Sequence, residues 1–158
     1  MKRIVVAAVA ALLSAGMLAA PAAGSQAQFA SVRQATAPLH VVSKAEAAGY
    51  EKFLPCFDLP GVGGMGQHFA DIASIDDTIE ADHPEVLVYE PAPSGYRLVA
   101  VEYVIPQVDW TATEAPELFG EHFHRNDTLG IWALHVWIWR PNPGGIHADF
   151  NPAVSDCP

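Results

Sequence analysis

β-Branched and aromatic residues are concentrated in the second half of the chain, where they form runs typical of strands. Two such runs, residues 86–90 (VLVYE) and 97–105 (RLVAVEYVI), are separated by the turn formers of residues 91–95. This pattern predicts a β-hairpin. A third apolar run, residues 131–140 (IWALHVWIWR), lacks polar alternation. It predicts a strand that is covered on both faces or lines an interior.

Helical signals are confined to the segment before these strands. Residues 38–48 (PLHVVSKAEAA) begin with proline, are rich in alanine and are followed by Gly49, which predicts one helix with a left-handed cap. Residues 28–37 are small and polar, and we expect a flexible lead-in there. The predicted fold class is therefore α+β or mainly β: one N-terminal helix, then a curved antiparallel sheet or small partly closed barrel.

The first residues are typical of a secretory signal peptide. Lys2 and Arg3 precede an apolar run over residues 4–20, and small residues follow as far as Ala27. We expect residues 1–27 to be removed by cleavage, with Ala22 and Ala23 as alternative cleavage points. This predicts a secreted, extracytoplasmic protein in which residues 38–158 form a single globular domain.

Two cysteines are present, Cys56 and Cys157. An even number of cysteines in an exported chain predicts a disulfide, which would close a loop of about 100 residues. Two free thiols or an intermolecular bridge are the alternatives.

The net charge of the chain limits the classes of partner that it can bind. The formal net charge is −10, and loss of Lys2 and Arg3 with the leader takes it to −12. Such a surface repels nucleic acid and anionic membranes, and no cluster of basic residues offsets it. No second run is long enough to span a membrane. Small molecules, metal ions and proteins remain as partners.

Histidine is the most informative residue type in the expected domain. His135 lies in the middle of an apolar run and shares the period of Trp137 and Trp139, so these three residues predict a ligand-binding sheet face. His135 is either a core histidine with both nitrogens satisfied, or a ligand or base in a pocket. The pair His122 and His124 has the spacing with which one strand supplies two metal ligands.

Glutamates interrupt the predicted hairpin. Glu102 lies inside an apolar strand, where a carboxylate is costly unless it faces water, a cation or a hydrogen-bond donor. Whether it shares a face with Glu85 or with Glu90 depends on a one-residue choice of register. If the hairpin packs beside residues 131–140, Glu102 and His135 can meet, with His68 delivered by the glycine-rich loop over residues 59–66. We therefore expect His68, Glu102 and His135 as the candidate ligands of a divalent metal.

These observations lead to three hypotheses of function. The leading one is a secreted module that binds a small ligand or a divalent metal. The alternative is a metal-dependent enzyme in which His68, Glu102 and His135 leave a coordination position open for water or substrate. The third is an envelope protein-interaction domain with no small-molecule site.

Several linked motifs carry a resemblance that spans residues 45–157. They are GGMGQHF (63–69), LVYEP (87–91), LVAVEY (98–103), PELFG (116–120), LHVWIWRPNPGG (134–145) and FNPAVSDC (150–157). In these motifs the chain resembles a group of small uncharacterised secreted bacterial proteins of the actinobacterial type. The resemblance implies export and a single domain, and it assigns no catalytic residue.

Overall fold

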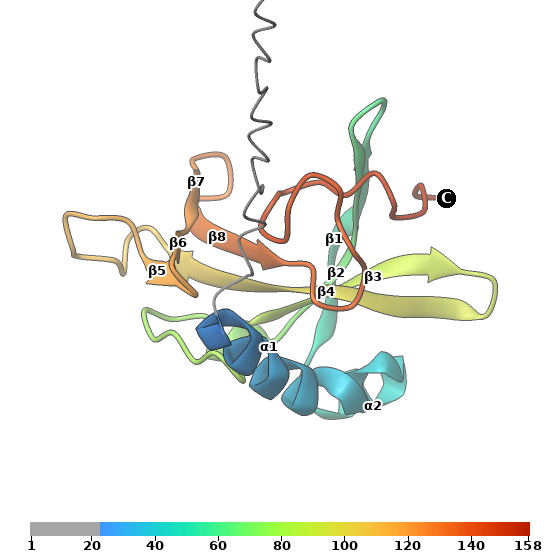
Figure 1. Ribbon diagram of the computed structural model, residues 1–158, viewed down its shortest axis with the longest axis horizontal. Coiled ribbons are helices and arrows are strands. Elements are labelled where there is room, and N and C mark those ends of the chain that lie inside the picture. The colour runs from blue at the N-terminus through green and yellow to red at the C-terminus, as the bar shows by residue number, and fades with distance from the viewer. Residues whose placement is uncertain (1–22) are drawn as a thin grey trace, which may run out of the picture.

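The structure is a computed structural model that describes residues 23–158, with side chains from residue 28 onward. The chain is mostly β, as expected. Six antiparallel strands form a sheet with the order β1-β2-β3-β4-β8-β7, which curls into about half of a barrel (Figure 1). The strands are β1 (Glu51–Leu59), β2 (Gly63–Ala70), β3 (Val86–Ala92), β4 (Gly95–Pro106), β7 (His124–Asn126) and β8 (Ile131–Val136). The hairpin predicted over residues 86–105 is confirmed as β3 and β4.

A small second sheet lies beside the first. It consists of β5 (Glu117–Leu118) and β6 (Glu121–His122), which pair antiparallel. The backbone then continues through Phe123 into β7, which pairs with β8. His122 and His124 therefore belong to different sheets.

The helical region differs from the prediction of one helix over residues 38–48. It comprises α1 (Ala23–Thr36), a 3₁₀ turn η1 (Ala37–His40) and α2 (Val42–Ala47), and a further 3₁₀ turn, η2 (Ile72–Ser74), lies in the connector to β3. Val41 has an extended conformation with ψ 105°, which separates η1 from α2. Gly49 adopts the predicted positive φ.

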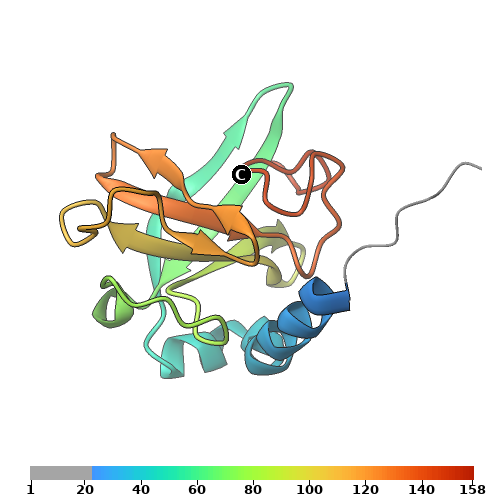
Figure 2. The same cartoon turned by 60° about the vertical axis from the view of Figure 1, so that its left-hand side comes forward.

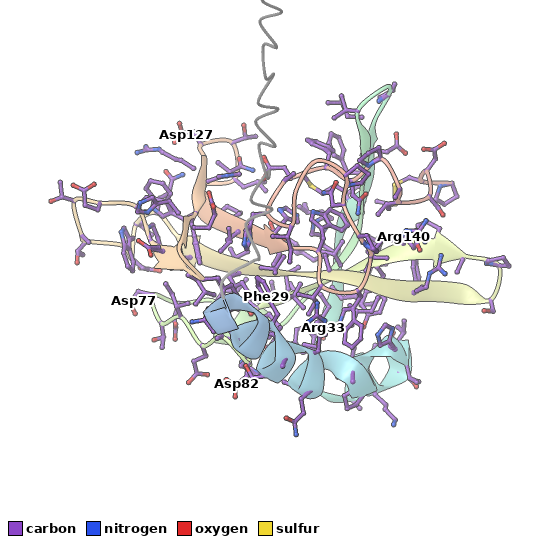
Figure 3. All side chains as sticks on the ribbon, viewed as in Figure 1. Phe29, Arg33, Asp77, Asp82, Asp127 and Arg140 are labelled. Atoms are coloured by element: carbon purple, nitrogen blue, oxygen red, sulfur yellow. A yellow bond between two sulfur atoms is a disulfide. The ribbon has the colours of Figure 1, made fainter. Side chains whose placement is uncertain are left out.

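The flexible lead-in expected over residues 28–37 is also wrong, because these residues belong largely to α1. Phe29 and Val32 are buried against the sheet, at 5% and 0% exposure. They stand three positions apart and so lie on one side of the helix. Figure 3 labels Phe29 and Arg33 on this helix. The expected signal peptide over residues 1–27 lies outside the described residues apart from residues 23–27.

The two faces of the curled sheet are covered differently. One face packs against α1 and α2 through the main apolar core, which includes Phe29, Val32, Tyr89, Tyr103 and Leu134. The other face is covered in part by the C-terminal segment, as Figure 2 shows. Val154 of that segment packs with Val88, Ala100 and Trp137 in a separate small cluster. The candidate metal ligands lie on this second face.

The glycine-rich loop expected over residues 59–66 is instead the end of a long hairpin formed by β1 and β2. Gly63, the first residue of β2, and Gly66, inside the strand, have positive φ values of 145° and 89°. A Cβ at Gly66 would stand 2.6 Å from the Tyr89 carbonyl oxygen, so the close approach of β2 to β3 requires glycine there. His68 is consequently carried by a strand rather than by a loop.

The predicted disulfide is present and joins Cys56 of β1 to Cys157 near the C-terminus. The two cysteines are 101 positions apart in sequence. The bond ties the C-terminal segment to the edge strand of the sheet. Among the described helices, none has the length and apolar character needed to cross a membrane.

Candidate metal centre

Glu102 and His135 face each other directly across two neighbouring strands. β4 pairs with β8 so that Glu102 and His135 are register partners. Residues directly opposite in an antiparallel pair have side chains on the same face, a few ångströms apart. The distance from Glu102 Oε1 to His135 Nε2 is 3.5 Å. The meeting of these two residues that the sequence predicts is therefore found.

His68 reaches the same point from β2, two strands away. Val88 of β3 is the register partner of His68 on one side and of Ala100 on the other. Ala100 precedes Glu102 by two residues, so His68 and Glu102 lie on one face of the sheet. Because the sheet is curled, the His68 side chain extends over β3, and its Nε2 lies 3.5 Å from Glu102 Oε2.

The three side chains form a compact cluster of ligand atoms. One donor atom from each of His68, Glu102 and His135 lies within 4.8 Å of the other two. Each imidazole faces a different oxygen of the one carboxylate. Two ligands bound to a tetrahedral zinc ion at 2.0–2.1 Å stand about 3.3 Å apart. The two histidine–carboxylate distances of 3.5 Å are close to that spacing and longer than an ordinary N–H···O hydrogen bond.

Burial controls the charge state of this cluster. The exposed fractions of His68, Glu102 and His135 are 8%, 7% and 3%. Burial lowers the pKa of His68, against a smaller opposing effect of Glu102. Burial also lowers the pKa of His135, to about 4. Both imidazoles are therefore neutral at pH 7 and have a lone pair available for a metal.

The carboxylate is destabilised in the same surroundings. Burial raises the pKa of Glu102, and the nearby His68 lowers it by less. Asp149 adds a further raising effect. A divalent cation placed between the three side chains would favour the ionised carboxylate and remove this penalty.

His135 has no hydrogen-bond partner at either ring nitrogen. Among the described residues, the buried side-chain nitrogen and oxygen atoms without a hydrogen-bond partner are Nδ1 and Nε2 of His135. Leaving a buried polar group unpaired costs about 1–3 kcal/mol. His135 is therefore not a core histidine with both nitrogens satisfied. Its environment leaves one nitrogen facing Glu102 and the other facing Asp149.

Asp149 and His124 lie on the outer side of the cluster. Asp149 Oδ1 is 3.8 Å from His135 Nδ1 and 2.8 Å from His124 Nδ1. His124 pairs with Ala133 of β8, two residues before His135, so both imidazoles share a face. The side chains of His124 and Asp149 are about half exposed. The cluster thus extends from the buried His68 to the surface.

The structure separates the two tryptophans that the sequence placed beside His135. Trp137 stays with His135, since the two rings are stacked 6.1 Å apart at 12°. Trp139 lies on the opposite side of the sheet, where its Nε1 donates to Thr36 Oγ1 and its ring meets His40 edge-on. The prediction of one ligand-binding face formed by His135, Trp137 and Trp139 is wrong for Trp139.

The strand pattern ends before Trp139, beside a β-bulge in β4. The register between β3 and β4 shifts between Val88 and Tyr89, which leaves Val99 without a partner on β3. The Val99 carbonyl instead accepts the N–H groups of Trp139 and Arg140. β8 ends at Val136, so the alternation of side chains that holds along a strand does not continue to Trp139.

Neither His122 nor Glu90 belongs to the cluster. His122 is exposed and pairs in the small sheet, while His124 bonds to Asp149, so the two do not act as a ligand pair from one strand. Val86 is the register partner of Glu102, which puts Glu90 rather than Glu85 on the Glu102 side of β3. Glu90 binds the Arg97 side chain and the Ser155 N–H. Glu90 therefore anchors the C-terminal segment.

Sequence reasoning missed Asp149. This residue lies in the irregular segment after β8, and no periodicity links it to His135. The segment is folded back by bonds from Trp137 N to Ile146 O and from Asn142 Nδ2 to Phe150 O. The glycines and prolines of residues 141–145 predict a turn there, but they do not predict where the chain returns.

Comparison of this chain with protein-family models, with curated proteins and with solved structures finds no match.

Proposed function

We propose that this protein binds one divalent transition-metal ion through His68, Glu102 and His135. The observation that carries the proposal is the buried His135 ring, whose two nitrogens lack partners while Nε2 faces a carboxylate at 3.5 Å. Two imidazoles and one carboxylate form a donor set that suits zinc and its first-row neighbours. Calcium and magnesium prefer sites made of oxygen atoms. Zinc is therefore the probe of choice.

The metal also resolves the electrostatic problem of the cluster. Without it, a carboxylate and two imidazoles are buried with no hydrogen bond between them, which is costly. With a bound metal ion, one lone pair of each imidazole and the negative charge of the carboxylate all interact with the ion. The ligands come from three strands of one sheet, and such strands hold side chains more rigidly than loops do.

A metal-dependent enzyme is the second candidate, and the number of protein ligands favours it. Three protein ligands leave a fourth position for water or substrate, as in catalytic zinc sites. The three residues are at most 8% exposed, whereas the side chain of Asp149 is about half exposed, so a substrate would approach the cluster beside Asp149. Addition of azide to the cobalt-loaded protein separates the two functions. A change in the visible spectrum indicates an accessible coordination position, and an unchanged spectrum indicates a closed binding site.

We propose further that the protein acts outside the cytoplasm. The disulfide between Cys56 and Cys157 supports this, since such bonds persist in oxidising compartments. The charged and apolar residues at the start of the chain add to this support. An extracytoplasmic metal-binding module is thus the function that the site supports best.

Calorimetric titration of untagged, EDTA-treated protein with Zn²⁺ tests the proposal. We expect one site per chain with a Kd below about 1 μM, because three preformed ligands are present. His135→Ala should abolish this binding. His122→Ala is the matched control, because His122 is exposed and lies in the other sheet, and it should bind zinc like the wild type. A wild type without zinc binding, or a His135→Ala variant with unchanged affinity, contradicts the proposal and favours a protein-interaction domain.

A further inference from the structure

Asp149 lies beside the second ring nitrogen of His135, the candidate metal ligand. If His135 binds the metal through Nε2, which faces Glu102, its Nδ1 carries the proton. That Nδ1 is buried and has no partner, and Asp149 Oδ1 lies 3.8 Å from it. A shift of less than about 1 Å turns this separation into a hydrogen bond.

Metal-binding histidines commonly donate their second ring N–H to a carboxylate, which fixes the tautomer and the ring orientation. We infer that Asp149 is a positioning residue for this site: it accepts the Nδ1–H of His135 and keeps Nε2 unprotonated and directed at Glu102 and His68. This inference rests on the proposed function for its effect on metal affinity. Its effect on the tautomer of His135 does not need the metal.

His124 holds Asp149 in place. Its Nδ1 lies 2.8 Å from the same Asp149 oxygen that faces His135. One carboxylate oxygen can accept two hydrogen bonds, so the two imidazoles do not compete for it. The result is a chain of contacts from His124 through Asp149 to His135.

The segment that carries Asp149 is fastened to β8 around His135. His147 Nδ1 lies 3.1 Å from the His135 carbonyl oxygen. Trp137 Nε1 donates to the Ala148 carbonyl, immediately before Asp149. These bonds set the position of the Asp149 backbone relative to the His135 ring, so the carboxylate needs only a small side-chain adjustment.

The tautomer of His135 tests this role in the metal-free protein. Long-range ¹H–¹⁵N correlation spectra of histidine-labelled protein at pH 7.5 distinguish a proton on Nδ1 from one on Nε2. We expect the wild type to carry the His135 proton on Nδ1. Asp149→Ala should move a large share of it to Nε2. Asp149→Asn should largely restore the wild-type signal, because its amide oxygen still accepts a hydrogen bond.

Zinc affinity provides the second measurement. Loss of an outer carboxylate costs about 10- to 100-fold in metal affinity, which is the loss that we expect for Asp149→Ala. Asp127→Ala is the control, because Asp127 is an exposed aspartate that pairs with Arg125. Asp127 directly follows β7 and is labelled in Figure 3. It should alter neither tautomer nor affinity.

The two measurements separate the inference from the proposed function. If Asp149→Ala leaves both the tautomer and the zinc affinity unchanged, Asp149 is not a positioning residue, although the metal site stands. If the tautomer changes as expected but the wild type binds no zinc, the positioning role stands and the metal function is wrong. A wild-type proton on Nε2 also overturns the inference.

Discussion

Glu102 and His135 are direct register partners on β4 and β8, and their facing atoms stand 3.5 Å apart without a hydrogen bond. Cross-strand partners this close on a buried face normally satisfy each other by packing or by hydrogen bonding. Here both ring nitrogens of His135 lack a partner, burial disfavours the ionised form of Glu102, and His68 adds a third candidate ligand from two strands away. An ion between them would bind a ring nitrogen of His135 and favour the ionised carboxylate of Glu102.

Replacing Glu102 by glutamine tests whether zinc binding needs the Glu102 carboxylate. The change removes the negative charge and keeps the shape of the side chain. We expect the variant to lose zinc binding while remaining folded, because a neutral amide is cheaper to bury than an ionised carboxylate. At a zinc concentration 100 times the wild-type Kd, the wild type should gain about 2.7 kcal/mol in free energy of unfolding. The variant should gain none, and an equal gain in both proteins would contradict the role of Glu102.

The disulfide stabilises the folded protein by lowering the conformational entropy of the unfolded chain. The two cysteines are 101 positions apart, so the bond restricts a long loop in the unfolded state. The double change Cys56→Ser with Cys157→Ser should lower the free energy of unfolding by roughly 2–5 kcal/mol. Urea unfolding measures the loss, and a reductant should destabilise the wild type only. A variant as stable as the wild type would refute this prediction.

Glu85 makes stability depend on pH, because burial raises its pKa from 4.5 to about 7. Its side chain accepts the Val104 N–H. The folded state holds the Glu85 proton more tightly than the unfolded state, so stability falls as pH rises from about 4.5 to about 7. The loss is roughly 3 kcal/mol for this group.

Glu85→Gln should remove that loss, since glutamine stays neutral and its amide oxygen still accepts the Val104 N–H. Urea unfolding in EDTA at pH 5 and pH 8 should show the variant more stable than the wild type at pH 8, with little difference at pH 5. Glu51→Gln, at an exposed position of β1, should change stability by less than about 0.5 kcal/mol. An unchanged pH dependence in Glu85→Gln would show that the group stays solvated.

Removal of the proposed leader on export predicts a defined mass for the extracytoplasmic protein. The small residues at the end of the proposed leader predict a new N-terminus between Ala23 and Gln28. Cleavage after Ala27 would keep Phe29 and Val32, which pack against the sheet. Intact-mass measurement on the culture supernatant checks this. A secreted protein that retains Met1 would remove the basis for the proposed location.

The sequence predicted the elements that have a clear period. The β3–β4 hairpin followed from two β-branched runs around a turn, and the meeting of Glu102 with His135 followed from packing that hairpin beside the next strand. Apolar continuity also predicted, correctly, that His135 is buried. These features depend on local patterning, which a sequence displays directly.

The errors arise where tertiary contacts override local pattern. β8 ends at Val136, and the chain beyond it bonds to the carbonyl of the bulged residue Val99, with Trp139 on the helical side of the sheet. The segment before residue 38 forms α1 because Phe29 and Val32 are buried against the sheet. Asp149 approaches His135 through a turn whose course depends on hydrogen bonds to distant backbone. Apart from the helical spacing of Phe29 and Val32, these contacts have no period that a sequence pattern could show.

Locating a bound zinc ion tests whether His68, Glu102 and His135 together hold a metal. Crystals of the zinc-loaded protein, measured on both sides of the zinc absorption edge, give an anomalous difference map. We expect one strong peak per chain, about 2.0–2.2 Å from His68 Nε2, His135 Nε2 and a Glu102 carboxylate oxygen. A strong peak elsewhere, or no peak while the three side chains keep their present spacing, would contradict it.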